Sequence, residues 1–269
     1  MEIRKAISSD KNIVLEFCKN TFSWGDYISD VWDYWISEGN LLVAIIEKTP
    51  VAICHSSFLG NEQIWIEGIR VKKNLRRKGL AKNLVKHSEI IAKKNNCKIA
   101  KMLIESTNKN SIKLAENLNY KNETKWDFYT LLPKKNITSN DLKFASDENK
   151  ILNHVNKLTS DYVKSWRWIP FSRDIISTLI NKEKILVLEK NETLDGLAIL
   201  VASEHFDKTL MITLVSGTNE VLYKILSYIQ NFAFIKNYKR IQILTKLDPL
   251  PNHESLEKKF SFFLMKKVL

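Results

Sequence analysis

A short basic segment with one glycine carries the clearest chemistry in this sequence. It consists of Arg76-Arg77-Lys78-Gly79-Leu80-Ala81. A glycine lets the backbone approach a ligand closely, and a helix N-terminus offers unpaired N–H groups with a partial positive charge. Three cationic side chains beside such a turn suit a pyrophosphate. The chain has only 7 glycines in 269 residues, which favours a functional role for Gly79. The alternative is a solvated basic loop that contains a glycine.

The elements that would position this segment are a strand before it and a helix after it. Residues 64–71 are typical of a strand, and residues 79–96 have the 3.6-residue periodicity of a helix. The helix face is formed by Leu80, Leu84, Ser88, Ile91 and Ala92. A second buried strand is expected at 98–104, followed by a short amphipathic helix through Leu118. This order predicts a βαβα unit with a right-handed crossover.

The combination resembles the acetyl-CoA-binding motif of the GNAT acetyltransferases, in which a strand is followed by [QR]-x-x-G-x-[GA] and a helix. Arg76, Gly79 and Ala81 occupy the three defining positions, and Asn108 with Ser111 fits a second family pattern, N-x-x-[AS]. The resemblance implies acetyl-CoA as the co-substrate. It also implies that the coenzyme is bound by Ile69, Val71, Arg76, Arg77, Lys78, Gly79, Leu80, Ala81, Asn108 and Ser111.

Internal similarity predicts two domains. Residues 21–48 and 163–190 can be aligned at a constant offset of 142, which places Trp24 on Trp166. We expect an α/β (α+β) chain of tandem GNAT-like domains, each a mixed, mostly antiparallel sheet flanked by helices. Residues 1–132 would bind acetyl-CoA, and residues 140–269 would be a degenerate copy. The alternative is a chance likeness, because any two α/β domains share such patterns.

The second half departs from the first at the position of the basic turn. There it has Ser216-Gly217-Thr218-Asn219, which contains no basic residue. Thr218 or Asn219 would cap the following helix, but we do not expect this turn to bind a pyrophosphate. Trp166 and Trp168 would lie where the first half has Trp24 and Asp26.

The resemblance implies further roles in catalysis. The backbone amide of Ile69 would stabilise charge on the thioester carbonyl oxygen, and that of Val71 would lie near the pantetheine. Glu67 is our candidate for the group that takes a proton from the amine. It stands two residues before Ile69 in an otherwise apolar strand, and therefore on the same side of the pleat. The alternative is that Glu67 forms a structural ion pair.

Two departures from the family concern the leaving group. Many members have a tyrosine that protonates the thiolate, and Ala115 stands at its position here. Some also have a glutamate on the fifth strand, where this chain has Leu103. These differences keep open a second interpretation, that of a non-catalytic acyl-CoA-binding or regulatory module.

An aromatic and acidic segment, residues 21–35, is expected to face the acceptor. Trp24, Asp26 and Tyr27 would form an aromatic wall with a carboxylate, which suits a cationic amine; packing is the alternative role. The segment is loosely similar to the subfamily that includes histidine Nα-acetyltransferases. The predicted function is transfer of an acetyl group from acetyl-CoA to a primary amine of a small molecule or peptide, by direct attack on the thioester.

Composition excludes several other classes. No apolar run approaches the roughly 18 residues that a membrane helix needs, and Asp10 and Glu16 interrupt the N-terminus where a signal peptide would be apolar. We therefore expect a cytoplasmic protein.

The 3 cysteines and 5 histidines lack metal-ligand spacing, so no metal is expected. The net charge of +12 fits coenzyme A, and no nucleic-acid-binding motif accompanies it, so nucleic acid is not an expected partner. The oligomeric state stays open.

Overall fold

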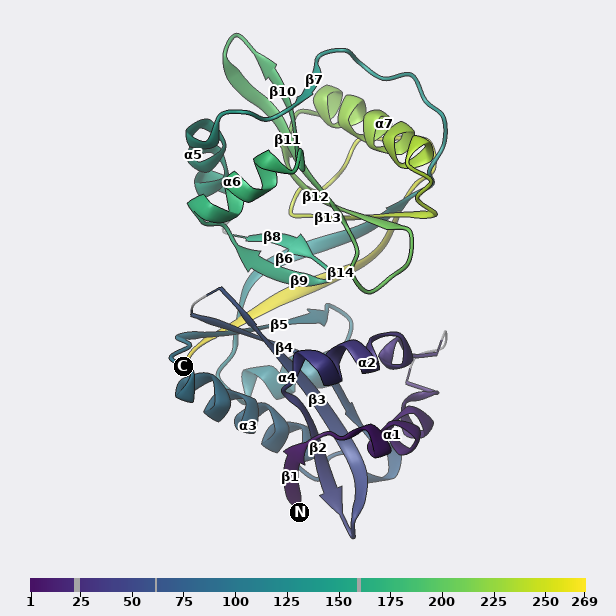
Figure 1. Cartoon of the computed structure of the whole chain (residues 1–269), viewed down its shortest axis with the longest axis vertical. Helices are drawn as coiled ribbons and strands as arrows, with labels where there is room; N and C mark the ends of the chain where they lie inside the picture. The colour runs from purple at the N-terminus through teal and green to yellow at the C-terminus, as the bar shows by residue number, and fades with distance from the viewer. Residues whose placement is uncertain (22–24, 61, 159–160) are drawn as a thin grey trace. The chain divides into compact units, whose positions relative to one another are not determined.

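The structure, a computed structural model, describes residues 1–21, 25–60, 62–158 and 161–269 (Figure 1). The chain forms two compact units. Unit 1 comprises Met1–Glu123 together with Leu264–Leu269, and unit 2 comprises Thr124–Phe263. The boundaries expected from the sequence, 1–132 and 140–269, therefore differ from these units at both ends of the second half.

Unit 1 is a sheet with helices on both faces. Its elements are β1 (Glu2–Lys5), η1 (Ser8–Asp10), α1 (Lys11–Cys18), α2 (Ile28–Glu38), β2 (Leu41–Ile46), β3 (Thr49–Leu59), β4 (Gln63–Val71), η2 (Lys73–Leu75), α3 (Leu80–Lys94), β5 (Ile99–Glu105) and α4 (Lys109–Glu116). The strands follow the order β1-β2-β3-β4-β5. Neighbours run antiparallel except for β4 and β5, which are parallel. The expected βαβα unit is β4-α3-β5-α4.

Alternating side chains explain how both faces of this sheet are covered. Leu41, Val43 and Ile45 of β2 belong to a buried cluster with α1 and α2. The intervening Leu42 and Ala44 are also buried, because a sheet covered on both faces has apolar residues at every position. On the expected apolar face of α3, Leu80, Leu84, Ser88 and Ala92 are buried and Ile91 is half-buried.

Unit 2 repeats part of this order of elements. It contains β7 (Leu142–Phe144), α5 (Glu148–Leu158), β8 (Asp161–Lys164), β9 (Arg167–Pro170), α6 (Arg173–Asn181), β10 (Ile185–Lys190), β11 (Thr193–Ala202), β12 (Thr209–Gly217), α7 (Asn219–Ile235) and β13 (Arg240–Thr245). Two strands, β6 (Lys121–Leu131) and β14 (Leu256–Val268), have residues in both units.

The strands of unit 2 follow the order β6-β13-β12-β11-β10-β7, with β8 and β9 as a separate hairpin. As in unit 1, three antiparallel strands are followed by a long helix and a parallel strand: β10-β11-β12-α7-β13 corresponds to β2-β3-β4-α3-β5. One core cluster packs α7 against the strands of this unit, with Ile225 and Ile229 fully buried. The predicted fold class, mixed and mostly antiparallel sheet flanked by helices, is confirmed.

Among the residues that the structure describes, none of the helices combines the length and the apolar character that crossing a bilayer requires.

Candidate functional site

The basic turn of unit 1 has an unusual backbone. Arg77 and Gly79 both adopt left-handed conformations, with φ of 65° and 79°. A Cβ built on Gly79 would have no heavy atom within 4 Å, so the space above this residue is open. Gly79 is also the N-cap of α3 and supplies no side-chain acceptor to the first helical turn. The first N–H groups of α3 can therefore serve an external anion.

The side chains of this turn divide into two groups. Arg77 and Lys78 are exposed, and the exposed Arg76 donates from Nε to the carbonyl oxygen of Val71 at 3.2 Å. Leu80, by contrast, is buried in the core, and Ala81 is half-buried. Any contact of Leu80 with a phosphate would have to come from its backbone amide.

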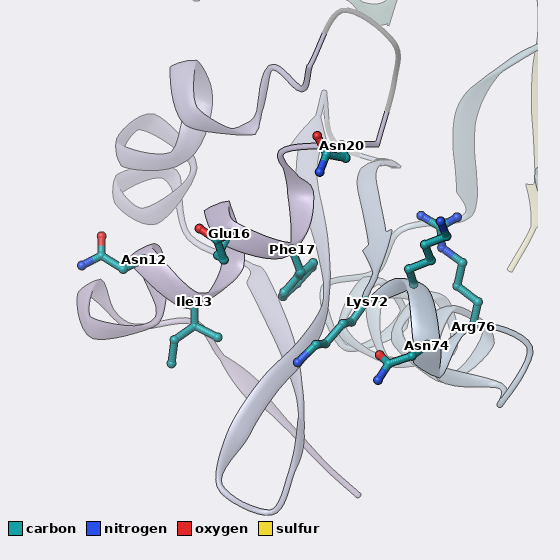
Figure 2. A pocket seen from close by; sticks show the side chains of 9 residues that line it. Asn12, Ile13, Glu16, Phe17, Asn20, Lys72, Asn74 and Arg76 are labelled. Carbon is teal, nitrogen blue, oxygen red and sulfur yellow. The ribbon is translucent and has the colours of Figure 1, made fainter.

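A groove of about 1150 Å³ lies beside the turn (Figure 2). One wall consists of residues in or just after α1, and the other consists of residues that follow β4. The lining residues are Asn12, Ile13, Glu16, Phe17, Asn20, Lys72, Lys73, Asn74 and Arg76. The cationic side chains gather on the β4 side, so this wall suits an anionic ligand.

The strands β4 and β5 separate before the turn is reached. Their ladder joins Gln63, Ile64 and Trp65 to Ile99, Ala100 and Lys101, whereas β4 continues to Val71 and β5 to Glu105. Unit 2 differs, because β12 and β13 stay paired from Thr209↔Arg240 to Leu214↔Thr245. Only the first unit therefore opens its parallel strand pair toward the start of the following helix.

The connections to the long helices differ as well. In unit 1, eight residues separate the end of β4 from the start of α3, whereas Thr218 alone separates β12 from α7. Thr218 accepts a hydrogen bond from the Val221 N–H at 3.4 Å, which confirms one of the two caps expected there. The connection between β12 and α7 is therefore shorter than the one between β4 and α3, and it carries no basic residue.

The second motif lies at the start of α4. Asn108 is the N-cap of this helix, and its Oδ1 accepts a hydrogen bond from the Ser111 N–H at 3.1 Å. Both residues therefore serve the helix itself. Ala115, at the position of the family's tyrosine, is buried in α4, and Leu103 is half-buried on β5.

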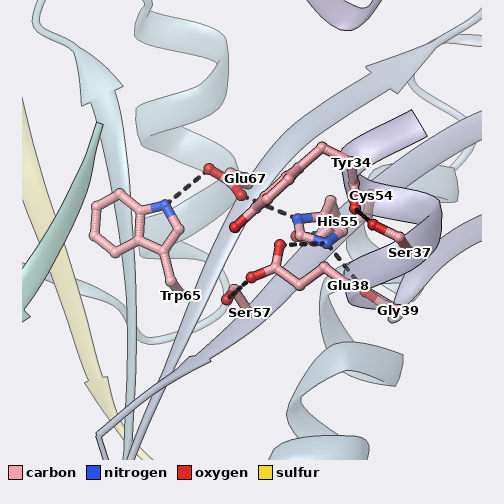
Figure 3. A network of polar contacts seen from close by, with 9 residues as sticks. All are labelled: Tyr34, Ser37, Glu38, Gly39, Cys54, His55, Ser57, Trp65 and Glu67. Carbon is pink, nitrogen blue, oxygen red and sulfur yellow. Dashed lines mark hydrogen bonds and ion pairs between the residues drawn. The ribbon is translucent and has the colours of Figure 1, made fainter. Parts of the chain in front are cut away.

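Glu67 lies in a network of polar contacts (Figure 3). One carboxylate oxygen, Oε1, lies 3.0 Å from Nδ1 of His55, and the other, Oε2, accepts a hydrogen bond from Trp65 Nε1 at 3.1 Å. His55 is fully buried, and its Nε2 lies 3.0 Å from the carbonyl oxygen of Gly39. The surroundings of Glu67 therefore include polar groups, because Trp65 donates an N–H to its carboxylate and a ring nitrogen of the cross-strand neighbour His55 faces it.

A bulge interrupts β4 directly after Glu67. His55 faces Glu67 and Ile53 faces Arg70, so Gly68 and Ile69 together oppose one residue of β3. This irregularity breaks the alternation from which Glu67 and Ile69 were expected to share a side of the pleat. Gly68 has a φ of 64°, and a Cβ there would lie 2.3 Å from the Trp35 ring, so this glycine makes room for Trp35.

The segment that was expected to face the acceptor contains an ion pair between Asp26 and Arg70. Asp26 accepts hydrogen bonds from Nε and Nη2 of Arg70 at 2.6 and 3.1 Å, and the two side chains are 3% and 12% exposed. The guanidinium also lies 5.2 Å from the centroid of the Tyr27 ring. Burial raises the pKa of Tyr27, against the opposing effect of Arg70. Trp24, the third residue expected here, lies outside the described residues.

Sequence reasoning missed His55, Glu38 and Arg70. Glu38, at the end of α2, accepts a hydrogen bond from Ser57 Oγ at 2.6 Å and lies 3.4 Å from His55 Nε2. A signal for His55 did exist, since a short hairpin between β3 and β4 pairs Leu59 with Gln63 and so brings position 55 opposite position 67. The partner of Arg70 lies 44 residues away and gives no such signal.

Within the described part of the chain, no three or more histidine, cysteine, aspartate or glutamate side chains gather so as to hold a metal ion. Cys18, Cys54 and Cys97 are buried free thiols, and burial raises the pKa values of Cys18 and Cys54 to about 12.

Comparison with known proteins agrees with this geometry. Residues 11–120 match the model of the acetyltransferase (GNAT) family. The first half of the chain therefore carries the sequence pattern of this family, over the span that holds the basic turn, Glu67 and Asn108. No protein with a curated description matches the chain.

Solved structures share the fold over the whole chain. A GCN5-related N-acetyltransferase from Sphaerobacter thermophilus is 11% identical, with a TM-score of 0.68 and coverage of 99% of this chain and 95% of that one. A tandem GNAT protein from the clavulanic acid biosynthesis pathway is 9% identical, with a TM-score of 0.57 and coverage of 99% and 98%. A GCN5-related N-acetyltransferase from Kribbella flavida is 13% identical, with a TM-score of 0.51 and coverage of 100% and 71%. At these identities the likeness is one of fold.

Proposed function

We propose that unit 1 is an acetyl-CoA-dependent N-acyltransferase, which moves an acetyl group to a primary amine by direct attack of the amine on the thioester. The observation that carries the proposal is the separation of β4 from β5 directly before a left-handed, basic turn at the start of α3. A long, thin ligand with a pyrophosphate in its middle fits such an opening. Acetyl-CoA would supply the activated acyl group as a thioester.

The residues present fit this ligand. The first-turn amides of α3, with Gly79 at the N-cap, would receive the pyrophosphate, and the exposed Arg77 and Lys78 would add positive charge. Asn108 and Ser111 are proposed to contact the coenzyme through the exposed start of α4.

The backbone of β4 can supply hydrogen-bond donors. The Lys72 N–H donates to Val51 O on β3 at 2.9 Å. Since amides alternate in direction along a strand, the Val71 N–H points away from β3, toward the side on which β5 has diverged. This direction supports its proposed role beside the pantetheine. We assign the Ile69 amide, at the bulge, to the thioester carbonyl oxygen; such a donor is typically worth about 3 kcal/mol.

Glu67 is proposed as the group that accepts the amine proton. Its carboxylate accepts a hydrogen bond from Trp65 Nε1 and faces His55. These contacts fix the orientation of Glu67. Tyr27 and Asp26 are proposed to line the acceptor side, where the pairing with Arg70 fixes Asp26.

A screen for coenzyme A release tests the proposal. Amino acids, polyamines and peptides are each incubated with acetyl-CoA and the full chain, and free thiol is measured. Because of the loose similarity to histidine Nα-acetyltransferases, free amino acids with histidine among them come first. We expect release that depends on both the protein and one class of amine, with the N-acetyl product visible by mass spectrometry.

A second function, that of a non-catalytic acyl-CoA-binding module, is favoured by one observation: Ala115 is a buried methyl group at the position of the family's tyrosine. The same screen separates the two functions. A thermal shift with acetyl-CoA in the absence of any amine-dependent release would support the binding module.

Acetyl-CoA should bind at one site per chain. Unit 2 keeps β12 and β13 paired and has the single residue Thr218 in place of the basic turn, so it offers no opening for a pantetheine. Isothermal titration of the full chain with acetyl-CoA should give a stoichiometry of one. Two equivalent sites would contradict the proposal that residues 140–269 form a degenerate copy.

A further inference from the structure

His55 holds the Glu67 carboxylate in place from inside the protein. Its ring is fully buried and stacks on Trp35, with ring centroids 4.5 Å apart and planes 5° from parallel. Its two nitrogens contact Glu67 Oε1 and Gly39 O, both at 3.0 Å. Rotating the ring by 180° about its attachment would replace these nitrogens with carbons, so both contacts favour the orientation observed.

These two contacts fix how many protons the pair holds. A carbonyl oxygen only accepts hydrogen bonds, so His55 Nε2 must carry a proton and donate it to Gly39 O. The Nδ1–Oε1 contact needs a further proton, because without it two lone pairs would face each other at 3.0 Å. That proton lies on Nδ1, as an imidazolium beside a carboxylate, or on Oε1, as a carboxylic acid beside a neutral imidazole.

We propose that His55 and Glu67 act as one proton-accepting unit, in which His55 positions the Glu67 carboxyl and shares one proton with it. This inference rests on the proposed function insofar as it concerns catalysis. His55 is a positioning residue, since it is fully buried and would act on the substrate only through Glu67.

Two carboxylates and the C-terminal end of a helix face the ring of His55. Glu38 Oε2 lies 3.4 Å from Nε2, so that carboxylates face both ring nitrogens. Gly39 is the C-cap of α2, and the C-terminal end of a helix attracts a cation. Other titratable groups nearby include the Tyr34 phenol on α2 and the Cys54 thiol on β3 (Figure 3), and the Tyr27 phenol, which interacts electrostatically with Glu67. Burial raises the pKa of Cys54 to about 12.

The proton balance of the reaction follows from this pairing. An N–H bond of the attacking amine breaks, its electron pair stays on nitrogen, and an O–H bond forms on Glu67. The pair then holds one more proton than in its resting state, and releasing this proton to water restores the resting state. With the shared proton on Nδ1, Glu67 is a carboxylate between turnovers and can accept the amine proton; with the shared proton on Oε1, that proton moves to Nδ1 as Oε2 accepts the new one.

Nuclear magnetic resonance tests the shared proton without any activity. The full chain is labelled with ¹⁵N at histidine and ¹³C at the glutamate carboxyls, and the signals are assigned by their absence in His55→Asn and Glu67→Gln. Near pH 7 we expect a protonated Nε2 and one further proton, on Nδ1 or on the Glu67 carboxyl. In Glu67→Gln the shared proton should be absent, which leaves His55 with a proton on Nε2 alone. An unprotonated Nδ1 facing an ionised Glu67 in the wild-type chain would overturn the proposal.

The kinetic test uses His55→Asn, with His87→Asn on α3 as the matched control. Asparagine can still donate a hydrogen bond to Glu67, but it brings no positive charge. The carboxylate should then become protonated at a higher pH, so the acidic limb of the kcat profile should move upward by about 1–3 pH units. The KM for acetyl-CoA should change little. An unmoved acidic limb in a folded, active variant would show that His55 is merely structural.

The two tests separate this inference from the proposed function. If no amine releases coenzyme A, the proposed function fails, while the resonance experiment still decides whether the proton is shared. If His55→Asn does not fold, the histidine signals that change between the wild-type chain and Glu67→Gln identify His55, and this comparison supplies the same decision.

Discussion

Replacing Glu67 with glutamine is expected to lower turnover by a factor on the order of 10²–10⁴, the usual contribution of a general base. Glutamine keeps the size of the side chain and an oxygen that can accept the hydrogen bond from Trp65 Nε1. It cannot take a proton from the amine. The loss should therefore appear in kcat, while acetyl-CoA binding, measured by thermal shift, stays close to that of the wild-type chain.

Glu62→Gln is the matched control for this substitution. Glu62 is exposed, lies just before β4, and forms an ion pair with Lys98, so its loss removes a surface charge without touching the network around His55. We expect near-normal turnover in this control. If Glu67→Gln kept near-wild-type turnover across the whole pH range, another group would have to accept the proton, or the amine would have to arrive neutral.

Gly79→Asp is expected to abolish the stabilisation of the chain by acetyl-CoA. A ligand present at 100 times its dissociation constant raises the free energy of unfolding by about 2.7 kcal/mol. An aspartate at Gly79 would place a carboxylate in the open space above the turn and repel the pyrophosphate. The measurement is the acetyl-CoA-dependent shift of the melting temperature in the full chain.

Gly79→Asn separates charge from backbone effects. Asparagine and aspartate have nearly the same shape, and both tolerate the left-handed conformation with φ of 79°. The asparagine variant should keep more of the acetyl-CoA-dependent shift than the aspartate variant. A full shift in Gly79→Asp would mean that the coenzyme binds away from this turn.

Local physical chemistry made part of this protein predictable from its sequence. Apolar periodicity predicted α3, and the order of the elements from β4 to α4 followed from the pattern of residues 64–118. Thr218 could be named as a cap because a hydroxyl before a helix accepts an N–H from its first turn. Each of these features depends on residues close together in the chain.

Long-range pairing decided the rest. The sequence by itself determined the basic turn and its glycine, and it placed Glu67 in the strand before that turn. Only the tertiary structure brought His55 to Glu67, Arg70 to Asp26 and the last residues, Leu264–Leu269, into unit 1. It also shows that β4 and β5 separate after three paired residues, whereas β12 and β13 stay paired over six. These features depend on strand register, on a bulge that makes room for Trp35, and on ion pairs between distant residues, none of which leaves a periodic signal in the sequence.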